Sequence, residues 1–467
     1  MQYTDASYFS GTRKRKLIFL VIVLVVATLV LDTSLLRIYS FGSNNPFFSD
    51  IRIVIFTIIA IVYAVTQYVI LEFVKKGSVG IRRKEQLHIK LVHRIVTIVQ
   101  YFLTAVIFFI IVEMNLTSAY SVTAVTIALG LSYTLAIAML GLLAQRFFSW
   151  FKSNRNIVVL LYCISSAMLA INAAFTLAFI SVIMINSQPY VLSYVGASQT
   201  PFIAPGSLVD LLNYPYIIST VLSFMISWIA TITILRHYSP KLRQTRYLII
   251  LILPLVYFLL PFIPHFQDAI AALPQTESVL FIYTFIFTFS KPIGGILFGI
   301  AFWIIARSLK RGSAVRDYMI ISGFGLLLLF ISNQAVVLVN IIYPPFGLVT
   351  VSFMGLASYM LLLGVYSSAI SVSEDSKLRQ SIRHVALREP KLLDSIGIAQ
   401  MEQEIQKRVL AATKTTQELM TEETGIQSSL NEDDMKLYLQ QVIEEIQASK
   451  NKPNGTSKRD KFDNIEK

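Results

Sequence analysis

The residues of this chain with the clearest chemical potential are one lysine and two amides that lie inside long apolar segments. An ammonium group at bilayer depth costs about 2.5 to 3.5 kcal/mol on insertion scales, so Lys291 needs a partner, water or a break in its helix. Asn333 and Gln334 lie in the middle of the next apolar segment. Hydrogen bonding between helices is the simple interpretation of these amides. A polar cavity shared with Lys291 is the alternative, and it makes all three residues candidates for binding a ligand or an ion.

Three residues that disturb a helix follow Lys291 at once, namely Pro292, Gly294 and Gly295. Proline removes a backbone donor and frees a carbonyl on the preceding turn, which then needs another partner. This pattern predicts a discontinuous helix in which Lys291 meets an anionic substrate or a carboxylate from another span. The alternative is a proline kink in which Lys291 bonds to freed carbonyls or reaches an outer cavity, which is easier if the span begins later than residue 279.

The sequence contains no recognisable catalytic or metal-binding pattern. The chain has a single cysteine, Cys163, so neither an intrachain disulfide nor a thiolate metal cluster can form. The five histidines show no i, i+4 pair of the kind that a helical zinc motif requires; they are His88, His93, His237, His265 and His384. Nucleotide-binding glycine loops, nucleophile elbows and paired carboxylates at one depth are missing as well. We predict no catalytic residue, no metal site and no cofactor.

The elements that must position these groups are membrane helices. The chain has 467 residues, of which 55% are hydrophobic and 14% charged, whereas soluble domains carry about 25% charged residues. Spanning the hydrocarbon takes about 20 apolar residues. Ten segments meet or approach this length and predict an all-α integral membrane protein of about ten spans; they cover residues 17–36, 53–73, 95–114, 121–143, 157–185, 216–235, 247–263, 279–305, 318–342 and 346–370.

The basic residues between these segments predict one orientation. Loops on one side hold nearly all of the Lys and Arg, whereas the other side holds only Arg37 and Arg52. Because Lys and Arg stay on the cytoplasmic side, both termini should be cytoplasmic, and the cell membrane is the expected location. The net charge of +13 therefore belongs to loops next to anionic lipid. We expect the lipid bilayer, and not nucleic acid, as a partner.

Most carboxylates and small residues of the spans fit ordinary roles. Asp32 and Glu113 lie near outer ends of spans and Glu72 near an inner end, where each is expected to be interfacial. Small residues at helical spacing predict packing faces; they are Gly295 and Gly299 on the eighth span and Ala128, Ser132 and Ala136 on the fourth.

The sequence changes character after the last span and divides the chain into four parts: a basic cytoplasmic segment 1–16, the membrane domain 17–370, a cytoplasmic helical tail 371–447 and a disordered end 448–467. In the tail, a helix over 393–420 and another that begins near Asn431 each carry an apolar stripe, the first about three heptads long. The stripes define a tail interaction face; it consists of Ile398, Met401, Ile405, Leu419, Met435, Leu439, Val442 and Ile446. Such short helices need each other, a second subunit or a cytoplasmic protein partner.

Two functions compete on these observations. The tail favours a receptor or anchor, in which the membrane bundle sets the position of helices that engage a soluble partner or another copy of the chain. Lys291 favours a solute or ion transporter with a discontinuous eighth helix. A membrane-embedded enzyme would need a convergent set of acid, base or metal ligands that the sequence does not contain. We favour the receptor or anchor, with the transporter as the alternative.

Overall fold

The structure, a computed structural model, describes residues 23–33, 46–77, 86–192, 206–236, 244–263, 266, 289–309, 313–339, 343–374 and 391–424. The chain divides into two units, Met1–Ile398 and Ala399–Lys467, which are described separately. The predicted segments 1–16 and 448–467 lie outside the described residues.

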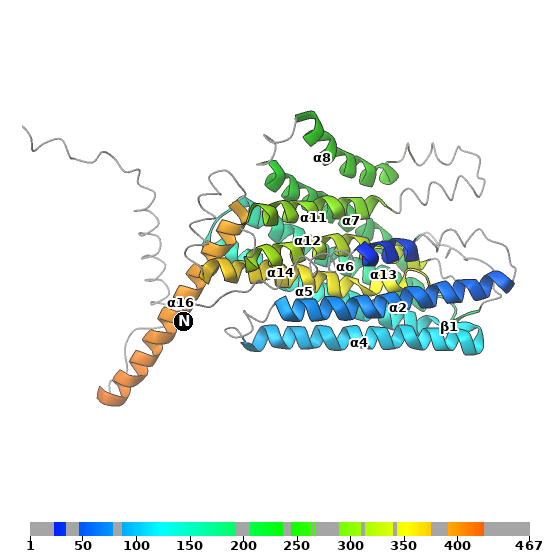
Figure 1. The fold of residues 1–467 in the computed structure, drawn as a ribbon, viewed down its shortest axis with the longest axis horizontal. Helices are drawn as coiled ribbons and strands as arrows, with labels where there is room; N and C mark the ends of the chain where they lie inside the picture. Colours follow the sequence, from blue (N-terminus) through cyan, green and yellow to red (C-terminus); the bar gives the residue numbers. More distant parts are fainter. Residues whose placement is uncertain are drawn as a thin grey trace, which may run out of the picture. The chain divides into compact units, whose positions relative to one another are not determined.

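The first unit is a bundle of long helices that run side by side (Figure 1). Its α-helices are α2 (Pro46–Gly77), α4 (Gln86–Thr117), α5 (Val122–Ser153), α6 (Ile157–Ile185), α7 (Leu208–Leu235), α8 (Gln244–Leu259), α11 (Ser290–Ser308), α12 (Ala314–Ser332), α13 (Leu348–Ser352) and α14 (Met354–Glu374). Two 3-10 helices extend α8 and α12; they are η2 (Leu260–Phe262) and η3 (Ala335–Val339).

Eight helical segments of the described chain are long and apolar enough to cross a membrane, so the protein is an all-α membrane protein in class. They comprise α2, α4, α5, α6, α7, α11, α12 with η3, and α13 with α14. Two predicted spans correspond instead to shorter apolar helices, Val23–Thr33 and Leu248–Phe262. The fifth predicted span, 157–185, has the same limits as α6.

One element departs from purely helical structure. β1 (Ala119–Ser121) and β2 (Tyr190–Leu192) form a two-stranded antiparallel ribbon. Tyr120 is buried there and stacks on Tyr343, with ring centroids 6.2 Å apart. Burial raises the pKa of the Tyr120 hydroxyl above its ordinary value, so this ring stays neutral. The ribbon ties the turn after α4 to the segment that leaves α6.

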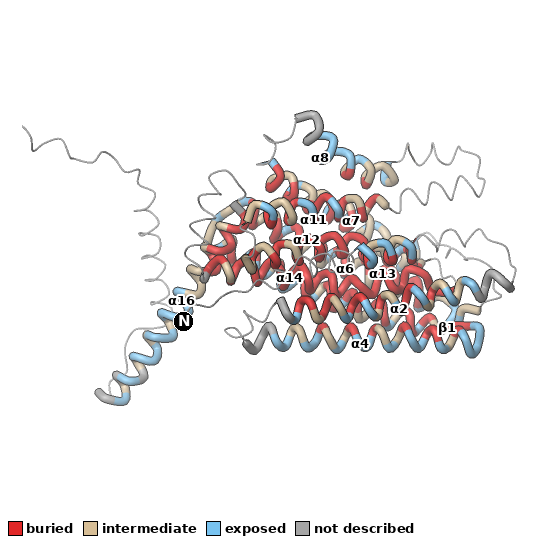
Figure 2. Tube along the Cα trace, in the orientation of Figure 1, coloured by how far each residue is buried: buried red, intermediate tan, exposed pale blue. Residues whose placement is uncertain are grey.

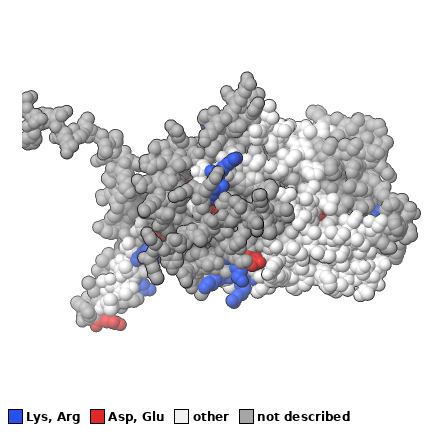
Figure 3. Space-filling view, in the orientation of Figure 1, with Lys and Arg blue, Asp and Glu red and all other residues white. Residues whose placement is uncertain are grey.

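The core of the first unit is built around α14. In the most apolar part of the span that α13 and α14 form, 100% of the residues are buried. The corresponding share is 89% for the span of α12 and only 28% for α4. α14 packs against α12 and α5, and Figure 2 shows it in red among tan and pale blue outer helices. The outer helices expose apolar side chains such as Ile98 and Phe108, and Figure 3 shows a broad uncharged surface over the bundle. These surfaces suit contact with lipid.

Small residues allow the central helices to approach closely, as predicted for Gly299. A Cβ atom added at Gly299 would lie 2.8 Å from the Gly323 carbonyl oxygen of α12. At Gly325, it would lie 2.6 Å from the backbone nitrogen of Leu361 in α14. Ser132 on α5 donates to the Val351 carbonyl at 2.7 Å, so the small ridge of α5 packs against the α13 region. These positions are packing contacts between backbones.

The tail helix predicted over 393–420 corresponds to α16 (Lys391–Thr424). Its first eight residues, 391–398, belong to the first unit and the rest to the second. In the second unit, Ile405, Val409 and Leu419 are exposed, with 47%, 38% and 55% of their surface accessible. The remaining predicted face residues lie outside the described part of the chain; these are Met435, Leu439, Val442 and Ile446.

Candidate functional site

The candidate site forms where α12 ends inside the membrane-spanning segment. Asn333 is the C-cap of α12, and its backbone N–H closes the last helical turn on the Leu329 carbonyl at 3.0 Å. The chain then continues as η3. The last carbonyls of a helix have no partner within it and accept hydrogen bonds from other groups. The sequence placed Asn333 and Gln334 in the interior of a continuous span, and the structure corrects this to a break in the helix.

Lys291 uses one of the carbonyls that this break exposes. Its Nζ donates a hydrogen bond to the backbone oxygen of Asn333 at 3.0 Å. A lysine ammonium in an apolar bundle needs such an acceptor, because desolvation without a partner is costly. The alternative that Lys291 bonds to freed carbonyls is therefore the geometry observed, although the carbonyl comes from α12 rather than from its own helix.

The break predicted just after Lys291 is not present in α11 as described. α11 begins at Ser290, which places Pro292 in the first helical turn and Gly294 and Gly295 in the next residues of a continuous helix. Proline is tolerated in a first turn, because the backbone N–H that it lacks would have no partner inside the helix. The predicted part of this span over 279–288 lies outside the described residues.

The two glycines after Pro292 have packing roles. A Cβ atom at Gly294 would lie 2.3 Å from the Phe224 ring of α7, and one at Gly295 would lie 2.8 Å from Cβ of Phe330 in α12. Both glycines therefore let α11 approach its neighbours where Lys291 reaches Asn333. They shape the site without contributing a polar group to it.

The side chain of Asn333 connects three further helices. Its Oδ1 accepts a hydrogen bond from the Tyr133 hydroxyl of α5 at 3.2 Å, and its Nδ2 donates to Asn172 Oδ1 of α6 at 2.9 Å. Asn172 Nδ2 in turn donates to Ser219 Oγ at 3.1 Å and to Thr220 Oγ1 at 2.8 Å, both on α7. We call this network the polar junction; its members are Tyr133, Asn172, Ser219, Thr220, Lys291 and Asn333.

The polar junction contains two of the three residues that the sequence singled out. Gln334 stays local, because its Nε2 donates to the Ile331 carbonyl of the same chain segment at 3.1 Å. Sequence reasoning missed Asn172, which is fully buried in α6. A polar amide in the middle of an otherwise apolar span was the available signal, and its partners on α5, α7 and α12 could not be read from spacing along the chain.

Asp32 forms a second buried polar site, and here the prediction of an interfacial residue was wrong. The residue has no accessible surface. Its carboxylate accepts hydrogen bonds from the backbone N–H groups of Gly347 and Thr350, at 3.0 and 2.9 Å, and from Thr350 Oγ1 at 2.8 Å. An acceptor at a helix start satisfies donors that the helix leaves unpaired. Asp32 thereby fastens the Val23–Thr33 helix to the start of α13.

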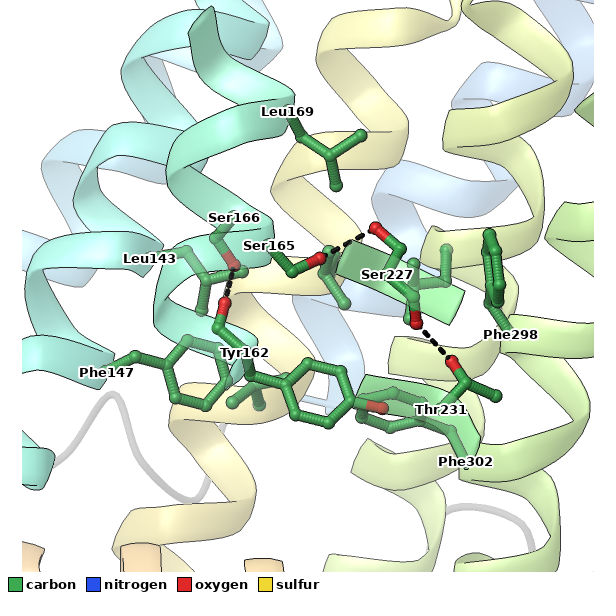
Figure 4. Close-up of a pocket in the computed structure, with 13 residues that line it drawn as sticks. Leu143, Phe147, Tyr162, Ser165, Ser166, Leu169, Ser227, Thr231, Phe298 and Phe302 are labelled. Carbon is green, nitrogen blue, oxygen red and sulfur yellow. Dashed lines mark hydrogen bonds between the residues drawn. The ribbon is translucent and has the colours of Figure 1, made fainter. Parts of the chain in front are cut away.

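A cavity at the centre of the bundle is lined by residues of α5, α6, α7, α11, α12 and α14 (Figure 4). It encloses about 10 Å³, the space of about one water molecule. Its hydroxyl groups come from Tyr162, Ser165 and Ser166 on α6 and from Ser227 and Thr231 on α7. An organic substrate does not fit this space in the conformation observed.

Within the part of the chain that the structure describes, no three His, Cys, Asp or Glu side chains come together as metal ligands. No protein-family model, no curated protein and no solved structure matches the chain. The function has to be inferred from the chain's own residues and their geometry.

Proposed function

We propose that this protein is a receptor or anchor of the cell membrane, whose helical bundle holds the start of a cytoplasmic helix and presents the rest of that helix to a partner. The observation that carries the proposal is the docking of the first turns of α16 within the first unit. A Cβ atom at Gly397 would lie 2.2 Å from Cγ1 of Val372 at the end of α14. Asn156 Nδ2, at the start of α6, donates to Ser395 Oγ at 2.7 Å. Leu392, Leu393 and Ile396 are buried.

Docking of this kind fixes residues 391–398 of α16 against the bundle. Gly397 lies so close to Val372 that a larger residue would not fit, and the Asn156 hydrogen bond holds the same segment from a second helix. α14 is the central helix of the bundle, and its C-terminal end carries Val372. In the proposed function, a rearrangement around α14 changes the contacts that hold the docked turns of α16.

The distribution of charge supports a cytoplasmic position for α16. Lys152 lies in the last turn of α5, Arg307 in the last turn of α11, and Arg236 caps the end of α7. Basic residues favour the cytoplasmic ends of membrane helices. α14 ends in the same direction, and α16 docks there. We further propose ten spans, two of which include the Val23–Thr33 helix and α8, and this number puts both termini in the cytoplasm.

The remaining turns of α16 carry the proposed interaction face. Ile398, Ile405 and Leu419 recur at multiples of seven residues, and Met401 precedes Ile405 by four. Ile405 and Leu419 are exposed, although residues of this type stabilise a helix mainly by packing against another surface. A cytoplasmic protein or a second copy of the chain would cover them. The proposal includes no cofactor and no nucleic acid.

The test introduces charge into the apolar stripe of the full-length protein. Ile405→Glu combined with Leu419→Glu should remove the partner, and Lys407→Glu combined with Lys414→Glu is the matched control. Lys407 and Lys414 lie about half a turn from the stripe, since each residue advances the helix by about 100°. Chemical cross-linking in native membranes, followed by quantitative mass spectrometry, compares the two variants with the wild type. An epitope-tagged second copy distinguishes self-association from a soluble partner.

The proposal predicts one dominant cross-linked protein, or the tagged copy, with the wild type and the lysine control, and its loss in the stripe variant. Equal membrane levels of all three proteins exclude misfolding as the cause. The same cross-links in the stripe variant and the control would contradict an interaction through this face.

The polar junction favours a transporter as the second candidate. Many transporters bind substrate at discontinuous helices inside the membrane, and here the break after α12 lies next to the Lys291 ammonium group. In this function, Lys291 supplies charge for an anion, and Asn333 supplies the amide beside it. Flux of small monocarboxylates and of chloride into proteoliposomes is the test. Lys291→Met should abolish flux that Lys291→Arg retains, and equal flux in both variants would remove Lys291 from a binding role.

A further inference from the structure

The hydroxyl groups around the central cavity have an unequal supply of donors and acceptors. Each aliphatic hydroxyl carries one proton and can accept two hydrogen bonds. Ser227 Oγ donates to the Ser223 carbonyl at 2.7 Å, and Thr231 Oγ1 donates to the Ser227 carbonyl at 2.8 Å. Ser165 and Ser227 hydroxyls lie 2.7 Å apart. Because the Ser227 hydroxyl already donates its proton to the Ser223 carbonyl, Ser165 is the donor in that pair. The hydroxyl protons of Ser165, Ser227 and Thr231 are therefore all used in hydrogen bonds, whereas most of their lone pairs remain free to accept.

Tyr162 provides the complementary group. Its residue is 6% exposed, and its hydroxyl faces Thr231, but among the described residues it makes no hydrogen bond of ordinary length and angle. Figure 4 shows the ring reaching from α6 toward Ser227 and Thr231 of α7. A buried hydroxyl without a partner is costly, and native structures rarely leave one unsatisfied. The Tyr162 hydroxyl is thus a donor without an acceptor, and it faces serine and threonine oxygens that can still accept hydrogen bonds.

We propose that this cavity is a binding site for one ordered water molecule, which accepts a hydrogen bond from Tyr162 and donates to Thr231 and to Ser227 or Ser165. A water molecule can donate two hydrogen bonds to the serine and threonine oxygens around the cavity and can accept one from the Tyr162 hydroxyl. The cavity volume of about 10 Å³ suits a single water molecule, which needs about 10 to 15 Å³ and two to four polar partners.

A metal cation fits the same wall less well. Its oxygen ligands would be present, but none of the residues that line the cavity is an Asp or a Glu. A cation would therefore remain without a counter-charge in the interior of a membrane bundle, which is strongly unfavourable. Tyr162 would also direct its hydroxyl proton toward that cation. The site is neutral and takes a neutral ligand.

The bound water extends a polar seam along α6 and α7. The direct bond between Ser165 and Ser227 joins the two helices at the cavity, and the bonds from Asn172 to Ser219 and Thr220 join them further along. The water adds Tyr162 to this seam. Polar contacts between membrane helices contribute modestly one by one, so their number along one interface matters.

The direct test is a cryo-electron microscopy map of the protein in nanodiscs, at a resolution that shows ordered water. The site predicts a density peak within hydrogen-bonding distance of the Tyr162 hydroxyl and of Thr231 Oγ1. A map that resolves the Asn172–Asn333 contact but has no peak there would overturn the proposal, as would a direct Tyr162–Thr231 hydrogen bond.

A stability measurement decides the same question by the sign of an effect. If water satisfies the Tyr162 hydroxyl, Tyr162→Phe should lower the melting temperature by about 2 °C. If the hydroxyl has no partner, the same change removes an unsatisfied polar group and should raise the melting temperature, which would contradict the proposal. Combining Tyr162→Phe with Thr231→Val should give a non-additive loss, whereas combining it with Thr231→Ser, which keeps the hydroxyl, should give an additive one.

Discussion

At the scale of single residues, the first helix is held by one carboxylate whose partners lie more than 300 positions away. Asp32 accepts three hydrogen bonds from two residues, Gly347 and Thr350. Gly347 has a φ of +91°, a conformation that glycine adopts without steric cost, and this turn aims its N–H at Asp32. The polar junction is built in a similar way, since Asn333 accepts hydrogen bonds from α5 and α11 and donates one to α6.

Asp32→Asn is predicted to destabilise the bundle by about 2 kcal/mol, because the amide replaces one acceptor oxygen with a donor that faces other donors. Thr350→Ser keeps the hydroxyl and serves as the control. Cys163 is the only cysteine of the chain and is buried, so the reaction of its thiol with a fluorescent maleimide reports thermal unfolding. A melting curve of Asp32→Asn that coincides with the wild type would show that the carboxylate contributes nothing to stability.

At the scale of elements, the contact between α12 and α14 depends on missing side chains. Gly325 in α12 faces the backbone of α14, and a Cβ atom added at Gly325 would lie 2.6 Å from the backbone nitrogen of Leu361. A backbone atom cannot rotate away as a flexible side chain can. The central position of α14 therefore requires glycine on its neighbour, and the same holds for Gly364 in α14, which faces Ser322 and Tyr318.

Gly325→Ala should cost about 1 to 3 kcal/mol, because it forces the two central helices apart. Gly130→Ala is the matched control, since a Cβ atom added at Gly130 in α5 meets nothing within 4 Å. Alanine at that position should stabilise the helix by about 0.5 to 1 kcal/mol. Cys163 reactivity during heating measures both variants, and equal shifts of the same sign would refute the close approach of α12 and α14.

The sequence patterns predicted the helices better than they predicted the contacts between helices. The limits of α6 follow from an uninterrupted apolar run between polar turns, and the observed helix has the predicted ends. The end of α12 at Ser332 could not be predicted, because neither proline nor glycine marks it and apolar residues resume at Ala335. Asp32 was placed at an interface because position in a span says nothing about which helix packs over it. Long-range hydrogen bonds decide these cases, and a single sequence does not contain them.

At the scale of the whole chain, the two units contain different features. The first contains the central helix, the polar junction and the docked turns of α16 that include Ser395 and Gly397. The second contains the exposed apolar residues Ile405, Val409 and Leu419. The receptor or anchor function requires that the first unit fold without the second, and that the second unit supply the partner contact.

A chain that ends at Gln400 tests this division most directly. It keeps the docked residues 391–398 and lacks the exposed stripe. This shortened chain should have an unchanged melting curve by Cys163 reactivity and an unchanged amount in the membrane, and it should lose completely the partner that cross-links to the full-length chain. Retention of that partner by the shortened chain would contradict the central claim, because the contact would then lie in the membrane unit rather than in the tail.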